Sequence, residues 1–149
     1  MLLQIALGSC LLVVNVLVMA CASLGLEIAF RLVHPWLIRP PQRSKLLLML
    51  VAVGIWVLLV LTVNIWIWAY VMFETGVFKS IEESLYFSIE AFSTLGLGDV
   101  VPVDDWRVFA AMAAVNGLLS FGLLTALLVE ALRQVRMSQL EQLEKAGND

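Results

Sequence analysis

The chain has 149 residues, of which 62% are hydrophobic and 14% carry a formal charge. This composition is too apolar for a water-soluble domain of that length and predicts an integral membrane protein. The net charge is −3 and the few basic residues form no stripe, which argues against a nucleic-acid-binding protein. No nucleophile stands with a base, and no metal-ligand cluster or nucleotide loop occurs, so we expect neither an enzyme nor a cofactor.

The first apolar segment exceeds the ~20 residues that a helix needs to cross a bilayer. We assign residues 1–33 to an N-terminal transmembrane helix. Glu27 lies four residues before Arg31, a spacing that favours a structural ion pair over a gating role. Residues 34–45 form a proline-broken basic linker, which the positive-inside rule places in the cytoplasm and which therefore puts the N-terminus outside.

The second span covers residues 46–73 and returns the chain to the outer surface. Trp66, Trp68 and Tyr70 suit an aromatic belt near its outer end. Asn64 is a polar residue in this apolar run, and we expect it to make an interhelical hydrogen bond.

A short helix is predicted over residues 81–92, because Ser80 and Glu83 form a capping-box pattern at its start. This helix is too short to cross a bilayer, so we expect it to enter the membrane and return. Its C-terminal end would then bring partial negative charge to the membrane interior. The alternative is a helix lying flat at the interface, which leaves the loop that follows without a purpose.

That loop reads Thr94-Leu95-Gly96-Leu97-Gly98-Asp99. Irregular backbone at membrane depth occurs where protein buries it or where it lines a water-filled path. Backbone carbonyls can all turn to one side only if every second residue is left-handed, a conformation that glycine adopts without penalty. Because Gly96 and Gly98 stand two apart, the loop is predicted to line a pore with oxygen ligands for a dehydrated cation.

The last apolar segment, residues 106–135, is a third transmembrane helix followed by a polar tail over 137–149. Spacings of three and four place one set of its side chains on a shared face: Leu118, Phe121, Thr125 and Val129. Gly117 and Gly122 permit either bending or close helix approach.

Together these residues resemble the pore domain of potassium channels over about residues 46–136. The loop resembles the Thr-Val-Gly-Tyr-Gly-Asp selectivity filter, with Leu95 at the Val position and Leu97 at the Tyr position. Glu90 stands where proton-gated bacterial two-helix channels carry a buried pore-helix glutamate, and residues 117–126 resemble their inner helix. The resemblance implies K⁺ as the permeant ion, with filter ligands from Thr94, Leu95, Gly96, Leu97 and Gly98.

The resemblance further implies that four side chains support the filter: Tyr86, Phe87, Glu90 and Asp99. We expect Glu90 and Asp99 to approach each other and share a proton, with the Tyr86 hydroxyl bonded to Asp99. Phe87 and Leu97 both lack the hydrogen-bonding group of the family pattern, which predicts a brace by apolar contact alone.

A cavity and gate are implied on the inner helix, lined by Gly117, Leu118, Phe121, Gly122, Thr125 and Val129. Most of this face is apolar, so closing the lower bundle would dewet the path.

The sequence thus predicts an all-α membrane fold with three transmembrane helices, a re-entrant pore helix and a selectivity-filter loop. One loop cannot encircle an ion, so we expect a homotetramer in membrane lipid, with no soluble ligand. The predicted function is passive potassium conduction in a bacterial inner (plasma) membrane, with the C-terminus cytoplasmic. A weakly selective monovalent cation channel and a nonconducting regulatory subunit with a pore-like fold remain as alternatives.

Overall fold

The computed structural model describes residues 1–37 and 42–147. The regular elements within these ranges are all helices: α1 (Leu2–Leu37), α2 (Gln42–Glu74), α3 (Ile81–Phe92), the 3-10 helix η1 (Asp104–Trp106) and α4 (Arg107–Gly147). Helices α1, α2 and α4 are long and apolar enough to cross a membrane. The predicted all-α membrane fold is therefore confirmed.

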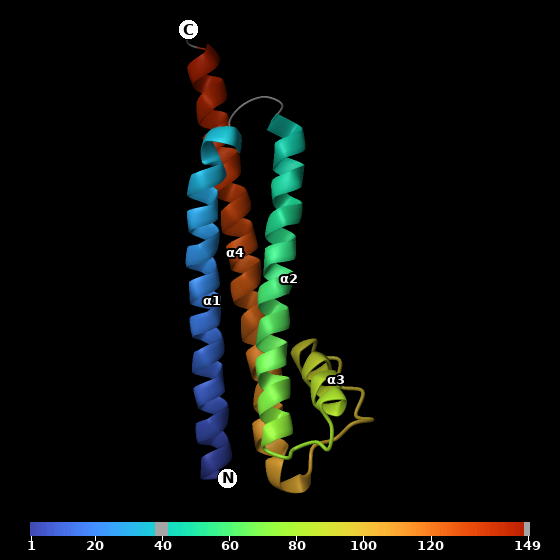
Figure 1. Cartoon of the computed structure of the whole chain (residues 1–149). Helices are drawn as coiled ribbons and strands as arrows, with labels where there is room; N and C mark the ends of the chain where they lie inside the picture. Colours follow the sequence, from blue (N-terminus) through green and yellow to red (C-terminus); the bar gives the residue numbers. More distant parts are fainter. Residues whose placement is uncertain (38–41, 148–149) are drawn as a thin grey trace.

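The three long helices run side by side, each antiparallel to the one that follows it in the bundle (Figure 1). The N-terminus and α3 lie at one end of the bundle, and the α1–α2 connection lies at the other. Helix α3 packs on α2 and α4, whereas α1 packs on α4 and α2. The chain is thus a three-helix bundle with a short helix added beside one end.

The long helices extend further than the sequence indicated. Helix α1 continues to Leu37, past Pro35, because a proline near a helix end removes one backbone hydrogen bond without stopping the helix. Helix α2 already begins at Gln42, so much of the expected linker over 34–45 is helical, and positions 38–41 lie outside the described residues. Helix α4 likewise continues from the inner-helix range into the predicted tail and ends at Gly147.

Helix α3 occupies the range expected for the short helix, and its start is fixed by capping. The backbone N–H of Glu83 donates to Ser80 Oγ at 3.1 Å, and the Glu83 carboxylate accepts from the backbone N–H of Lys79 at 3.2 Å. The first bond satisfies a donor that the helix N-terminus leaves open, and the second ties the residue before the N-cap to the first turn. At 12 residues, α3 is about 18 Å long, roughly half of a bilayer crossing.

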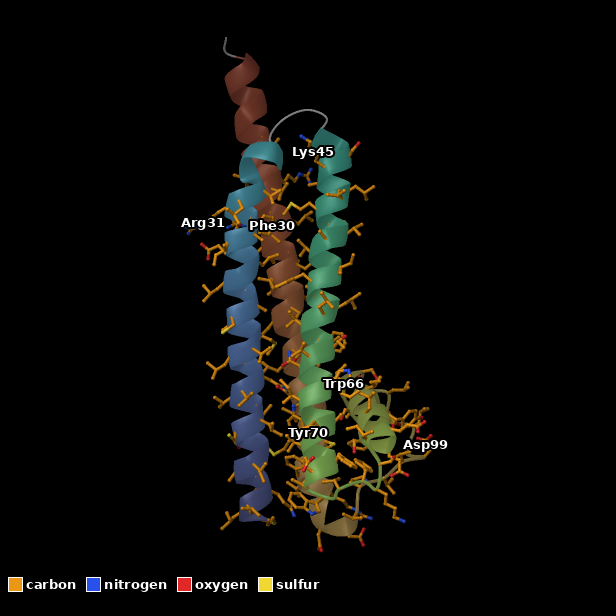
Figure 2. All side chains as sticks on the ribbon, in the orientation of Figure 1. Phe30, Arg31, Lys45, Trp66, Tyr70 and Asp99 are labelled. Carbon is orange, nitrogen blue, oxygen red and sulfur yellow. The ribbon has the colours of Figure 1, made fainter. Side chains whose placement is uncertain are left out.

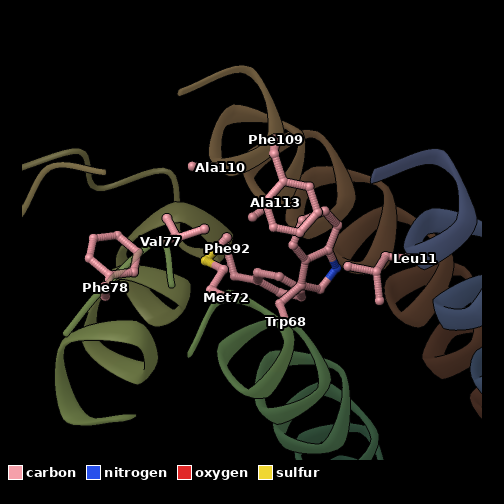
Figure 3. Close-up of a cluster of buried hydrophobic side chains, with 9 residues drawn as sticks. All are labelled: Leu11, Trp68, Met72, Val77, Phe78, Phe92, Phe109, Ala110 and Ala113. Atoms are coloured by element: carbon pink, nitrogen blue, oxygen red, sulfur yellow. The ribbon is translucent and has the colours of Figure 1, made fainter. Parts of the chain in front are cut away.

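The main core cluster joins all four α-helices near the α3 end of the bundle (Figure 3). Trp68 of α2 stacks on Phe109 of α4 with ring centroids 5.3 Å apart, while Leu11 of α1 and Phe92 of α3 close the cluster. Trp68 is fully buried, so its assignment to an aromatic belt was wrong. Its ring packs between helices because the apolar contact there outweighs an interfacial position.

Exposed groups mark the two ends of the bundle (Figure 2). Trp66 and Tyr70 are 48% and 58% exposed and lie on the half of α2 that carries α3. At the opposite end, Arg31 donates to Glu27 at 2.6 Å, which confirms the predicted ion pair.

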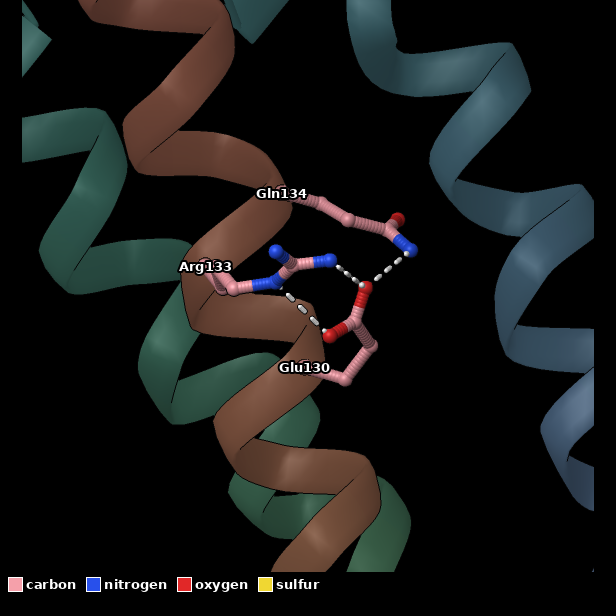
Figure 4. A network of polar contacts seen from close by, with 3 residues as sticks. All are labelled: Glu130, Arg133 and Gln134. Atoms are coloured by element: carbon pink, nitrogen blue, oxygen red, sulfur yellow. Dashed lines mark hydrogen bonds and ion pairs between the residues drawn. The ribbon is translucent and has the colours of Figure 1, made fainter.

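A second polar network lies on α4 (Figure 4), and its Glu130 lines the same pocket as Glu27 of the ion pair. Glu130 accepts from Arg133 Nε at 3.0 Å and from Gln134 Nε2 at 3.1 Å. Both acidic groups are therefore held by neighbours on their own helix, which gives each a structural role.

Gly117 allows α4 to approach the end of α3. A Cβ atom at this position would lie 2.4 Å from Phe92 Cα and 2.7 Å from the Phe92 carbonyl oxygen. Backbone atoms cannot yield as a flexible side chain does, so only glycine fits without moving α3. Gly122 has open space around the corresponding position. Of the two glycines, Gly117 thus serves close packing.

We predict that Gly117→Ala lowers the free energy of unfolding by about 1–3 kcal/mol, because the added methyl group must push Phe92 away. Gly122→Ala is the matched control and should leave stability unchanged or slightly raised. Thermal unfolding of both variants in detergent micelles measures the difference, and equal stabilities would contradict the close contact.

Candidate functional site

The loop after α3 has an alternating backbone. Thr94, Gly96 and Gly98 have φ values of 57°, 60° and 76°, whereas Leu95 and Leu97 are not in the left-handed region. Every second residue is therefore left-handed, as the spacing of the two glycines predicts. Such alternation turns successive carbonyl groups toward one side of the chain, unlike an ordinary strand.

Thr94 extends this pattern one step further than the glycines indicated. It is the one non-glycine residue with positive φ among the described residues. A side chain with a branched Cβ is strained in this conformation, and such strain persists only where the surroundings enforce it. The backbone N–H groups of Thr94 and Leu95 donate to the carbonyls of Ala91 and Glu90, both at 3.1 Å. The end of α3 thus fixes the start of the loop.

Glu90 holds the middle of the loop from behind. Its side chain is only 5% exposed, and its Oε1 accepts from the backbone N–H of Leu97 and, at 3.1 Å, from that of Gly98. The prediction of a brace by apolar contact alone was therefore wrong. A buried carboxylate gains most from backbone donors when water is excluded, which explains the arrangement.

Glu90 and Asp99 are not joined as the sequence reasoning expected. No hydrogen bond links the two carboxyl groups in the described part of the chain, and Glu90 Oε2 is buried without a partner there. Asp99 instead accepts from the Tyr86 hydroxyl at 2.9 Å and from the backbone N–H of Val100 at 3.0 Å. The expected Tyr86 contact is thus present, and this hydrogen bond raises the pKa of Tyr86.

Phe87 does not contribute to the brace in the way expected. Its ring packs on Phe78, with centroids 5.0 Å apart, and against the main core cluster. Leu95 and Leu97 are 63% and 62% exposed in the isolated chain. Their side chains and the loop therefore form an apolar, uncovered edge beside α3.

The face of α4 that the sequence singled out is also uncovered. Leu118, Phe121 and Val129 are 67%, 44% and 60% exposed, and Thr125 and Gly122 are exposed as well. Gly117 differs from them because it is buried against α3. Five of the six predicted cavity residues thus share a free surface, while the sixth is a packing residue.

The cation ligands that the loop offers in a row are uncharged oxygens. Among the described residues, no group of three or more histidine, cysteine, aspartate or glutamate side chains could hold a metal ion. The carbonyl oxygens of the loop and the Thr94 hydroxyl are hard ligands of the kind that suits alkali cations. One loop alone offers too few of them to replace a hydration shell.

Comparison with known proteins agrees with this geometry. A family model described as "Ion channel" matches residues 45–134, which include most of α2, all of α3, the loop and most of α4. The calcium-gated potassium channel TvoK of Thermoplasma volcanium is 38% identical over 68 residues, which cover 45% of this chain and 20% of the relative. The chain thus spans about a fifth of that relative's length. No solved structure matches the chain with significance.

We predict that Glu90→Ala frees the backbone N–H groups of Leu97 and Gly98, because both lose their acceptor. Amide hydrogen exchange at these positions should accelerate by at least about tenfold, the factor that corresponds to ~1.4 kcal/mol of lost protection. Glu90→Gln keeps an acceptor oxygen and should retain most of the protection. Tyr86→Phe is a second control, since it removes a bond to Asp99 only. Unchanged exchange in Glu90→Ala would contradict the brace.

Proposed function

This chain belongs to the ion channel family, and we propose that it conducts potassium ions passively through a pore built from four copies. The observation that carries the proposal is the alternating left-handed backbone at Thr94, Gly96 and Gly98. Carbonyls aligned by this backbone can replace the hydration shell of a dehydrated cation. The multi-pass membrane character of the chain agrees with such a role.

The need for four copies follows from the loop itself. A single loop presents carbonyls from one side, whereas a cation requires ligands all around it. Rotational symmetry supplies the missing ligands if the loops meet at one axis. The exposed Leu95 and Leu97 and the exposed face of α4 are apolar surfaces that such an assembly would cover or turn toward the pore.

The choice of potassium is supported by the loop sequence and by the similar potassium channel of Thermoplasma volcanium. In the proposed filter the ligands are the carbonyls of Thr94, Leu95, Gly96 and Leu97 and the Thr94 hydroxyl, with Gly98 completing the turn. Helix α3 points its C-terminal end at this loop, and its partial negative charge would lower the cost of a cation there.

Below the filter, α4 would line the permeation path. Leu118, Phe121, Thr125 and Val129 are exposed and lie at helical spacing along one face. Three of these side chains are apolar, so a modest narrowing of the four-helix bundle would expel water and stop conduction. Gly122 also lies on this exposed face, where α4 has room to bend or rotate.

The orientation in the membrane follows from charge. Arg31 and Lys45 lie at the end of the bundle opposite α3, and the positive-inside rule would put that end in the cytoplasm. The filter, α3 and the N-terminus would then face the outside of a cell's inner (plasma) membrane. Passive conduction of this kind requires neither a phosphorylation site nor a soluble ligand.

We predict that purified protein in lipid vesicles passes K⁺ at least about tenfold faster than Na⁺, since carbonyl cages discriminate between the two ions. Gly98→Ala should abolish this flux, because φ of 76° is costly for a residue with a Cβ. Gly54→Ala is the matched control, since Gly54 lies within α2 with nothing near the added methyl group.

Other outcomes of the same assay decide between the alternatives. Equal K⁺ and Na⁺ flux would replace the proposal by a weakly selective cation channel. A purified tetramer that passes no ions but alters the behaviour of a partner channel would indicate a regulatory subunit. A monomeric purified protein would overturn the pore itself.

We further predict that Glu90→Ala changes the lifetime of the open state in single-channel recordings by at least about threefold, because the filter loses its hydrogen-bonded brace. Glu90→Gln should stay close to the parent chain. Unaltered open lifetimes in Glu90→Ala would show that the brace does not control conduction.

A further inference from the structure

Three of the four asparagines of this chain are fully buried in the bundle. Asn15 of α1, Asn64 of α2 and Asn116 of α4 are each 0% exposed. Asparagine is rarely found completely buried in an apolar interior, since its amide must be hydrogen-bonded to be accommodated there. One asparagine from each long helix therefore calls for a common explanation.

The helical register places the three amides in one layer. Asn15 is four residues after Leu11 and four before Met19, and Asn64 is four residues after Val60 and four before Trp68. Leu11 and Trp68 belong to the main core cluster, and Met19 and Val60 to the next cluster along the bundle. Asn15 and Asn64 thus lie between the same two apolar clusters.

Helix α4 contributes to the same layer. Asn116 follows Ala113 of the main cluster by three residues, and Ser120 precedes Leu124 of the second cluster by four. Ser120 is also 0% exposed. The layer therefore comprises Asn15, Asn64, Asn116 and Ser120, and it is bounded by apolar side chains on both sides.

Most polar atoms of this layer have no hydrogen-bond partner within the described chain: Asn15 Nδ2 and Oδ1, Asn64 Oδ1, Asn116 Nδ2 and Oδ1, and Ser120 Oγ. Asn64 Nδ2 donates to Val60 O of its own helix at 3.1 Å, so the expected interhelical bond of Asn64 is not present. Trp68 Nε1 adds an unpartnered donor one turn away on the side of Leu11 (Figure 3). Orphaned groups of this number would be prohibitively costly in a membrane interior.

Their partners must lie inside the bundle, at the level of this layer. All four residues are inaccessible in the isolated chain, so neither lipid nor a neighbouring copy can reach them. The unpartnered set contains donors as well as acceptors, which does not suit a cation or an anion. Water both donates and accepts, and buried waters bind groups that lack other partners.

We propose that the layer is a buried hydration site in which internal water molecules bridge Asn15, Asn64, Asn116 and Ser120. Next to Asn116, Gly117 packs against the Phe92 backbone at the end of α3. The bridges tie α1, which lies outside the family-matched residues 45–134, to the two helices that flank α3. The proposal does not depend on ion conduction.

The test is solid-state NMR on the full chain in lipid vesicles with only asparagine labelled by ¹⁵N and ¹³C. Side-chain amides of Asn15, Asn64 and Asn116 should receive magnetisation from water, whereas the backbone amides of the same residues should receive little. Those backbone amides lie at the same depth and are the internal control. Asn148 lies outside the described residues, and its signals are assigned with Asn148→Gln. Side-chain amides without water transfer would overturn the hydration site.

A second measurement tests whether the layer acts as one unit. Asn15→Leu removes one of the groups that bind the bridging water, so the remaining polar groups of the layer lose part of their hydrogen bonding. This substitution should lower the melting temperature by about 5 °C. Replacing the three asparagines by leucine and Ser120 by alanine together should recover at least about half of that loss, because no orphaned group in the layer remains. Thr62→Val, on an exposed position of α2, is the control and should be neutral. If the losses in melting temperature caused by the single substitutions simply add in the combined variant, the idea of a shared site would be overturned.

Discussion

The structure depends on how the polar backbone groups of one short loop are hydrogen-bonded. A helix satisfies its own polar groups, but a loop cannot, and lipid offers no replacement. Here the carboxylate of Glu90 accepts from the N–H groups of Leu97 and Gly98, while the end of α3 binds the N–H groups of Thr94 and Leu95. With these donors occupied, the loop carbonyls are free to bind something else. The position of α3, and hence the packing around it, serves this arrangement.

That dependence explains why the contact between α3 and α4 is so close. Glu90 can reach the loop only if the last turn of α3 is fixed, and Phe92 at that turn is held by the Gly117 backbone and by the main core cluster. Trp68 and Phe109 fill the space behind it. Of the two possibilities that the sequence left open for Gly117, bending and close helix approach, the structure shows close approach to α3.

Much of the fold was predictable from local patterns. Long apolar runs identify α1, α2 and α4, and Ser80 with Glu83 identifies the start of α3, because both signals act over a few residues. The left-handed Gly96 and Gly98 were likewise foreseeable. What failed depends on tertiary packing: the burial of Trp68, the bonding of Glu90 to the loop instead of to Asp99, and the ring contact of Phe87. The positive φ of Thr94 was not predicted, although continuing the alternation two residues before Gly96 would have indicated it.

The distribution of polarity within the single chain points to where the assembly must act. Several polar groups lie buried inside the bundle, in the asparagine layer and at Glu90, whereas Leu95, Leu97 and one face of α4 are apolar and exposed. A water-soluble protein would bury such apolar side chains and expose its polar ones. In lipid alone, the loop carbonyls would lack hydrogen-bond partners. In the proposed pore, contacts with other copies and with a permeant ion would meet both conditions. The exposed apolar side chains and the loop are thus the parts of the fold that the proposed symmetric assembly would cover.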